Sequence, residues 1–248
     1  MPFLPALAAD SPWIGTWKLD LAKSHFAGET FTYSKSANGL MHYSDGSTIS
    51  YDFGIDGKEY KSAYNRTTTW SAAGDNAWDS VTKADGNVLA NFHRVLSADG
   101  KTLTVTVTGT RPDGTAFNDV TVYKRVTGSK GLAGKWRSTK VEISASDTVV
   151  ISIPSSGMWR LEFPGYKNTV EGKADGTELP VIGPTAPPGF TVSMKFVSPT
   201  KLSYVGKVNG KPQGYGPWTL AADGKSFTDL SWDAGKSSEK TIGVYDKQ

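Results

Sequence analysis

The chain has 248 residues, of which 38% are hydrophobic and 21% are charged, so it is long enough for one large or two modest domains and is not disordered in composition. Its 27 basic and 24 acidic residues are interspersed and leave a net charge of +3, which predicts no nucleic-acid partner because no basic stripe follows a phosphate backbone. The sequence has no cysteine, which excludes disulfides, thiolate chemistry and cysteine-ligated metal.

The first residues look like the end of a secretory signal peptide. An apolar run at residues 3–9 closes on small residues before a polar stretch, although a basic region and most of an apolar core are missing. We therefore expect residues 1–11 to be a signal-peptide remnant or a disordered N-terminus, and the protein to be secreted or periplasmic. No apolar run approaches the length of a membrane span, so no membrane-spanning segment is expected.

The chain contains an internal repeat. A Gly-x-Trp sequence, two Asp-Gly turns and a closing Val-Tyr sequence occur twice in the same order, at residues 15–17, 56–57, 99–100 and 122–123, and again at residues 134–136, 175–176, 223–224 and 244–245. The spacing is also kept, because Trp17 to Asp56 is 39 positions and Trp136 to Asp175 is again 39. Such a repeat indicates a duplicated unit. It predicts two domains, residues 12–127 and 131–248, joined by a short flexible stretch.

Strand and turn signals fill both units. Residues 102–108 alternate between apolar residues and Thr, which is typical of a half-buried strand, and turns that contain Asp-Gly flank this run. Further Asp-Gly and Asn-Gly pairs recur at intervals that indicate successive antiparallel hairpins. Because a meander of this size removes its exposed edges by closing on itself, we predict an all-β protein with two tandem antiparallel up-and-down β-barrels.

The Gly-x-Trp sequence on each opening strand resembles the signature of the lipocalin and calycin superfamily. In that superfamily the tryptophan plugs one barrel end against a basic residue of the last strand, a position matched here by Arg125 or Lys124 and by Lys247. With the turns and closing sequences, nearly the whole chain resembles, as two copies, a bacterial family of secreted lipocalin-like proteins of uncertain function. The resemblance implies lipocalin-like barrels in which Trp17 and Trp136 are buried equivalently, and it implies no particular chemistry.

Few residues are candidates for catalysis. His93 shares one face of an expected strand with Asn91 and Val95, and if that face points inward His93 is a plausible general base in a small cavity. Asp52 and Asp79 lie among aromatic residues, where burial can raise a carboxyl pKa enough for acid or base work, although most such residues face water. These three residues are the candidate catalytic groups.

Metal and cofactor chemistry has little support in the sequence. Three imidazoles, at His25, His42 and His93, can build a zinc or copper site, but no two of them are spaced as strand neighbours. The common hydrolase, nucleotide and metalloprotease motifs are absent from the sequence. We therefore expect no metal and no cofactor.

Aromatic residues are a richer signal, with 8 Trp, 10 Tyr and 10 Phe. Trp70 and Trp78 flank residues 71–77, a flexible tip at an expected barrel mouth, where an exposed tryptophan usually meets a ligand. The alternative is that both tryptophans pack inward as core. The candidate ligand-binding residues are Trp70, Trp78, Tyr51, Phe53 and His42.

These observations favour a secreted or periplasmic protein that binds a small apolar or aromatic ligand in a barrel mouth or in the groove between barrels. The alternative is a cofactor-independent acid–base enzyme (a hydratase, lyase, isomerase or hydrolase) that uses His93 with Asp52 or Asp79, an expectation that rests on fold analogy alone. A third class is a scaffold for protein contacts whose barrels are packed solid. A cavity inside either barrel distinguishes the first two classes from the third.

Overall fold

A computed structural model describes residues 11–155 and 157–248 of the chain. The expected signal-peptide remnant, apart from residue 11, therefore lies outside the described residues. Within the described ranges, no helix has the length and apolar character needed to cross a membrane.

Strands account for almost all of the regular structure in both repeats. The first repeat contains β1 (Gly15–Leu19), β2 (Thr30–Lys35), β3 (Met41–Ser44), β4 (Ser50–Phe53), β5 (Glu59–Lys61), a 3₁₀ turn η1 (Ala63–Asn65), β6 (Arg66–Gly74), β7 (Ala77–Ala84), β8 (Asn87–Leu96), β9 (Thr102–Thr110) and β10 (Ala116–Thr127). The second contains β11 (Gly134–Glu142), β12 (Thr148–Ser155), β13 (Met158–Phe163), a 3₁₀ turn η2 (Pro164–Tyr166), β14 (Asn168–Gly172), β15 (Asp175–Ile182), β16 (Phe190–Ser198), β17 (Lys201–Val208), β18 (Lys211–Leu220), β19 (Ser226–Asp233) and β20 (Thr241–Lys247).

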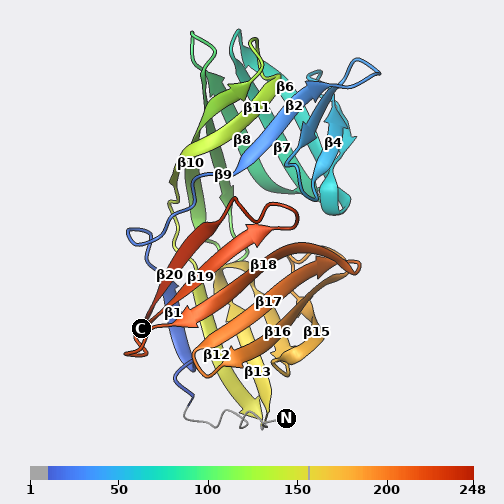
Figure 1. The fold of residues 1–248 in the computed structure, drawn as a ribbon. Coiled ribbons are helices and arrows are strands. Elements are labelled where there is room, and N and C mark those ends of the chain that lie inside the picture. The colour runs from blue at the N-terminus through green and yellow to red at the C-terminus, as the bar shows by residue number, and fades with distance from the viewer. Residues whose placement is uncertain (1–10, 156) are drawn as a thin grey trace. The chain divides into compact units, whose positions relative to one another are not determined.

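These strands form two antiparallel sheets. In the closed barrel, β1 joins β12 to β20 in a continuous ring, and in the open barrel the order is β4-β3-β2-β11-β10-β9-β8-β7-β6-β5, a sheet that is nearly closed (Figure 1). The prediction of an all-β protein with two antiparallel barrels is therefore confirmed.

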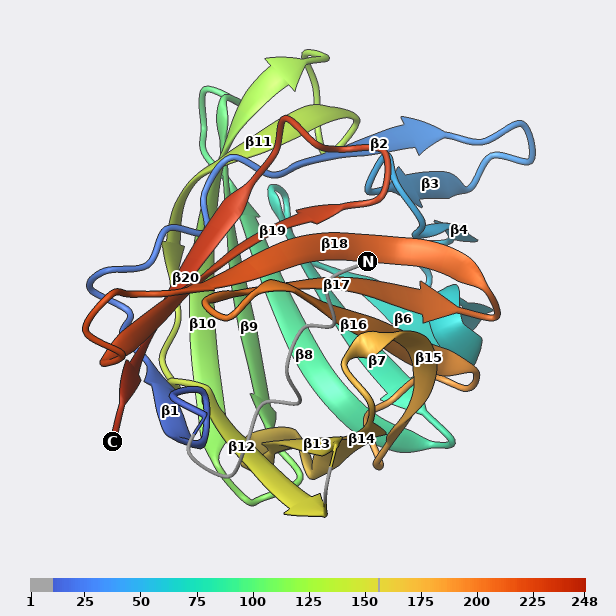
Figure 2. The ribbon, with the colours of Figure 1, turned by 60° about the horizontal axis from the view of Figure 1, so that its bottom comes forward.

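The two repeats exchange their opening strands. β1 pairs with β12 and β20, while β11 pairs with β10 and β2. In Figure 1 the blue β1 accordingly lies among yellow and red strands, and Figure 2 shows the same strand beside β12. Among the described residues, one compact unit contains residues 11–25, 146–155, 157–232 and 241–248, and the other contains residues 26–145 and 233–240. These units differ from the contiguous domains 12–127 and 131–248. Since both opening strands carry the same Gly-x-Trp sequence, local sequence alone does not specify which barrel each one joins.

The two tryptophans of the repeated sequence occupy equivalent buried positions, as expected. Trp17 and Trp136 are each 0% exposed. Each indole N–H donates to the carbonyl oxygen four residues earlier, Trp17 to Trp13 at 2.8 Å and Trp136 to Leu132 at 2.9 Å. Buried indoles with a satisfied N–H contribute large apolar area without an unpaired donor, so each one stabilises the core of its barrel.

A cation from the closing strand of a repeat lies over each of these indoles. The Lys247 Nζ atom is 5.1 Å from the centre of the Trp17 ring, and the guanidinium carbon of Arg125 is 4.1 Å from the centre of the Trp136 ring. Arg125 rather than Lys124 fills this position, because the Lys124 ammonium donates to the Thr102 hydroxyl instead.

The glycine before each tryptophan is required by the backbone. Gly15 has φ +143° and Gly134 has φ +144°, conformations that side chains with a Cβ rarely adopt. A Cβ on Gly15 would lie 2.8 Å from the Lys247 Cε atom, and one on Gly134 would lie 2.1 Å from the Thr127 carbonyl oxygen. The glycine therefore allows the closing strand to approach the opening strand.

The strand exchange predicts which barrel each tryptophan stabilises. Trp17→Ala should lower the free energy of unfolding by about 3 to 5 kcal/mol, as for other buried aromatics, and should speed amide hydrogen exchange in β12 to β20. Trp136→Ala, the matched variant, should speed exchange in β2 to β10 instead. Hydrogen exchange read by mass spectrometry checks this, and faster exchange in β2 to β10 of Trp17→Ala would contradict the exchanged topology.

Candidate functional site

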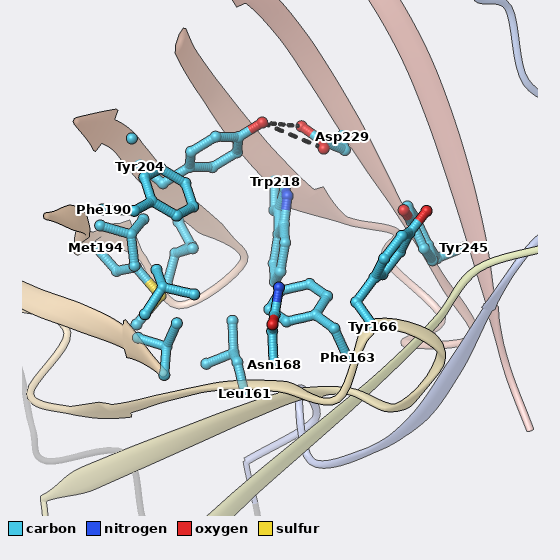
Figure 3. A pocket seen from close by; sticks show the side chains of 15 residues that line it. Leu161, Phe163, Tyr166, Asn168, Phe190, Met194, Tyr204, Trp218, Asp229 and Tyr245 are labelled. Atoms are coloured by element: carbon cyan, nitrogen blue, oxygen red, sulfur yellow. Dashed lines mark hydrogen bonds between the residues drawn. The ribbon is translucent and has the colours of Figure 1, made fainter. Parts of the chain in front are cut away.

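The closed barrel contains a cavity of about 310 Å³ (Figure 3). Its wall is largely apolar and aromatic, with side chains from β13, β16, β17 and β18 such as Leu161, Phe190, Met194 and Trp218. Among the described residues that line it, Asp229 is the one acidic residue, and none is a lysine, arginine or histidine. The cavity is therefore an apolar chamber with a single ionisable carboxyl group.

The alternation of strand residues directs Asp229 into this chamber. Phe227, two residues earlier on β19, is 1% exposed and packs in the core, so Asp229 lies on the same inner face. The Tyr204 hydroxyl, from β17, donates to the Asp229 carboxylate at 3.0 and 3.3 Å (Figure 3). To reach β19 the Tyr204 ring passes over β18 at Gly216, where a Cβ would lie 2.6 Å from the Tyr204 hydroxyl oxygen. Gly216 thus makes room for the contact.

Burial shifts the titration of both partners. Loss of hydration raises the pKa of Asp229 to about 6, and the hydrogen bond from Tyr204 opposes part of that rise. The pKa of Tyr204 is raised by burial and by the nearby Asp229 charge, so its hydroxyl remains a donor. The Trp218 indole N–H lies near the carboxylate and also lowers its pKa.

The open barrel contains a second cavity, of about 260 Å³. Its wall is rich in tyrosine and includes Arg66 and Arg94, and no aspartate or glutamate of residues 11–155 or 157–248 lines it. The two cavities therefore have ionisable groups of opposite sign.

The predicted catalytic residues do not meet in either cavity. His93 Nδ1 lies 2.7 Å from Asp79, and this cross-strand pair is about half exposed, with side chains 52% and 53% accessible. Phe92 and Arg94 occupy the inner face of β8, so the face that carries His93 points outward. Asp52 belongs to a different cross-strand pair, because its carboxylate lies 2.6 Å from His42 Nδ1.

The predicted ligand-binding residues also do not form one site. Tyr51 lines the open-barrel cavity. Trp70 is 1% exposed and stacks on Phe53 with ring centres 4.1 Å apart, so both belong to the core and not to the cavity wall. Trp78 packs against the same core without lining the cavity, and His42 faces outward with Asp52. The inward alternative for the tryptophans is the one found here.

The histidines are not gathered in one place. The backbone of His25 pairs with Ile242 in the closed barrel, while His42 and His93 belong to strands of the open barrel. Within residues 11–155 and 157–248, no three side chains of metal-ligating type lie together.

Sequence reasoning missed Asp229, Tyr204 and Arg94. A signal for two of them was present, because Arg94 lies between Phe92 and Leu96 and Asp229 lies two residues after Phe227, at the inward period of a strand. Tyr204 carries no such signal, since its role depends on Gly216 of the next strand.

No protein-family model matches the chain, and no curated protein or solved structure matches it either. The functional argument therefore rests on the two cavities and the side chains that line them.

Asp229→Asn should change the pH dependence of stability. Because the folded-state pKa is raised, the wild type loses stability as pH rises from about 4 through about 6, where the buried carboxyl ionises. The asparagine variant avoids this loss and should be more stable than wild type at pH 8 by on the order of 3 kcal/mol. Near pH 3.5 the carboxyl group is protonated in the folded protein, so the ionisation of Asp229 should no longer make the two proteins differ in their free energy of unfolding. Urea denaturation at both pH values measures this.

Asp75→Asn is the matched control, since Asp75 is an exposed residue of the hairpin between β6 and β7. It should leave the pH profile unchanged. A stability difference between Asp229→Asn and wild type that is the same at pH 3.5 and pH 8 would show that Asp229 does not titrate as described.

Proposed function

We propose that the closed barrel binds a small apolar or aromatic molecule that carries a hydrogen-bond donor or a basic nitrogen. The observation that carries this proposal is a cavity of about 310 Å³ with an apolar wall and a few polar groups that converge on it. Ligand sites in proteins have this size and composition.

The polar groups at the cavity define the chemistry of the ligand. Asp229 and the Asn168 Oδ1 atom are acceptors, and Asn168 Oδ1 is buried with no donor among the described residues. A buried polar group without a partner is costly, so a ligand that satisfies these atoms gains affinity. Without a cation in the wall, the cavity disfavours organic anions.

We further propose that the protein is a lipocalin-like, secreted or periplasmic bacterial binding protein. The support is the buried tryptophan that lies beneath a basic residue from a closing strand, present at both Trp17 and Trp136. The signal-like residues at the start of the sequence support export.

The acid–base alternative lacks a comparable site. His93 and Asp79 form an exposed pair on the outer face of the open barrel, where no described cavity holds a substrate. A solid scaffold is also disfavoured, because each barrel contains a cavity.

Binding in the closed barrel is tested with N-phenyl-1-naphthylamine, a neutral apolar dye that fluoresces in dry sites. Val181 lines the cavity, whereas the next residue, Ile182, is 65% exposed on the opposite face of β15. Val181→Trp should fill the chamber and weaken dye binding by about tenfold or more, since bulk replaces the apolar space that the dye occupies. Ile182→Trp should bind the dye like wild type, and equal affinity in both variants would remove the closed barrel as the site.

A further inference from the structure

The inner face of the open barrel holds a buried cation. Arg94 is 6% exposed and lies between Phe92 and Leu96 on β8. Its Nη1 atom donates to the Ser80 hydroxyl at 2.8 Å, and its guanidinium carbon lies 4.0 Å from the centre of the Trp70 ring. These contacts fix the guanidinium at the wall of the cavity of about 260 Å³.

Arg94 has no counter-ion in the described part of the chain. None of the ion pairs there includes Arg94, and its buried Nε–H has no acceptor. A buried charge is costly unless it is paired, and the neutral partners of Arg94, the Ser80 hydroxyl and the Trp70 and Phe92 rings, compensate only part of that cost. An anion in the cavity would supply the missing partner.

The neighbouring groups at the cavity also suit an anion. Tyr43 and Tyr51 line it, and neither hydroxyl has a hydrogen-bond partner among the described residues. Burial raises the pKa of both hydroxyls, so they stay protonated and can donate. Arg66 adds a second positive charge to the wall, with its guanidinium carbon 5.8 Å from the centre of the Tyr64 ring. Every charged group in this wall is therefore a cation.

The repeat shows that the fold itself does not need this charge. Arg94 lies five residues before Asp99 of a repeated Asp-Gly turn, and the residue five before the matching Asp223 is Trp218. The closed barrel forms with that tryptophan, 8% exposed, at the equivalent strand position. A residue that is dispensable for barrel formation and costly to bury unpaired points to a ligand.

We propose that the open barrel is a separate binding site for a small aromatic or amphipathic monocarboxylate. The carboxylate accepts hydrogen bonds from the Arg94 guanidinium, and the apolar body packs among the aromatic rings that line the cavity, Phe31, Tyr33, Tyr43, Tyr51 and Tyr123. Charge-assisted hydrogen bonds from arginine to carboxylate are among the stronger contacts available to a protein. This site does not depend on the function proposed for the closed barrel.

The test compares 2-naphthoate with 2-naphthamide at pH 7.5 by isothermal titration calorimetry, since the two compounds share a shape and differ in charge. Wild type should bind the carboxylate at least about tenfold more tightly than the amide. Arg94→Met should abolish this preference, and Arg94→Lys should keep part of it because the charge remains without the planar fork. Arg137→Met, on exposed Arg137 of β11 in the same sheet, should bind like wild type.

Two results would overturn the proposal. One is that wild type binds 2-naphthoate and 2-naphthamide with equal affinity. This measurement uses wild type alone and so does not depend on whether any variant folds. The other is a preference that survives Arg94→Met or is lost only in Arg66→Met, which would place the anion away from Arg94. Val181→Trp, which fills the closed barrel, should leave naphthoate binding unchanged, so failure of one site is distinguishable from failure of the other.

Discussion

Each barrel of this protein depends on one contact: a buried indole from an opening strand lies beneath a cation from a closing strand. Trp17 with Lys247 and Trp136 with Arg125 make this contact in the closed and open barrels. The indole packs in the core of its barrel, and backbone carbonyl oxygens nearby accept hydrogen bonds from both its N–H and the cation. Because each indole comes from the opposite repeat, neither barrel is complete from one contiguous half of the sequence. Each barrel also contains one of the two cavities described above.

The two barrels share this contact but differ in the side chains of their interiors. At one strand position the closed barrel has Trp218 where the open barrel has Arg94, and at another the closed barrel has Asp229 where the open barrel has Val105. Two substitutions in a duplicated unit therefore reverse the sign of the buried charge. Since each charged group loses hydration in its barrel, the two sites proposed above would favour ligands of opposite charge.

The repeat, the strand content and the burial of both tryptophans could be predicted from sequence, because equal spacing and period-two alternation are local features. The exchange of opening strands could not, since β1 and β11 carry the same Gly-x-Trp sequence, which does not distinguish one barrel from the other. The inward face of β8 was also ambiguous. His93 alternates with Arg94, and only the aromatic residue at Phe92 and the leucine at Leu96 indicate that the arginine faces the core. The contact of Tyr204 with Asp229 could not be predicted either, because it depends on Gly216 of the neighbouring strand β18.

The strand exchange is tested most directly with engineered cysteine pairs, because the natural chain has no cysteine to interfere. Thr16 is opposite Val150 in the closed barrel, and its counterpart Lys135 is opposite Thr32 in the open barrel. A barrel built from one contiguous half would instead place Thr16 opposite Thr32. Under mild oxidation, Thr16→Cys with Val150→Cys should form an intramolecular disulfide and Thr16→Cys with Thr32→Cys should not. Efficient cross-linking of the second pair, with none in the first, would contradict the exchanged barrels.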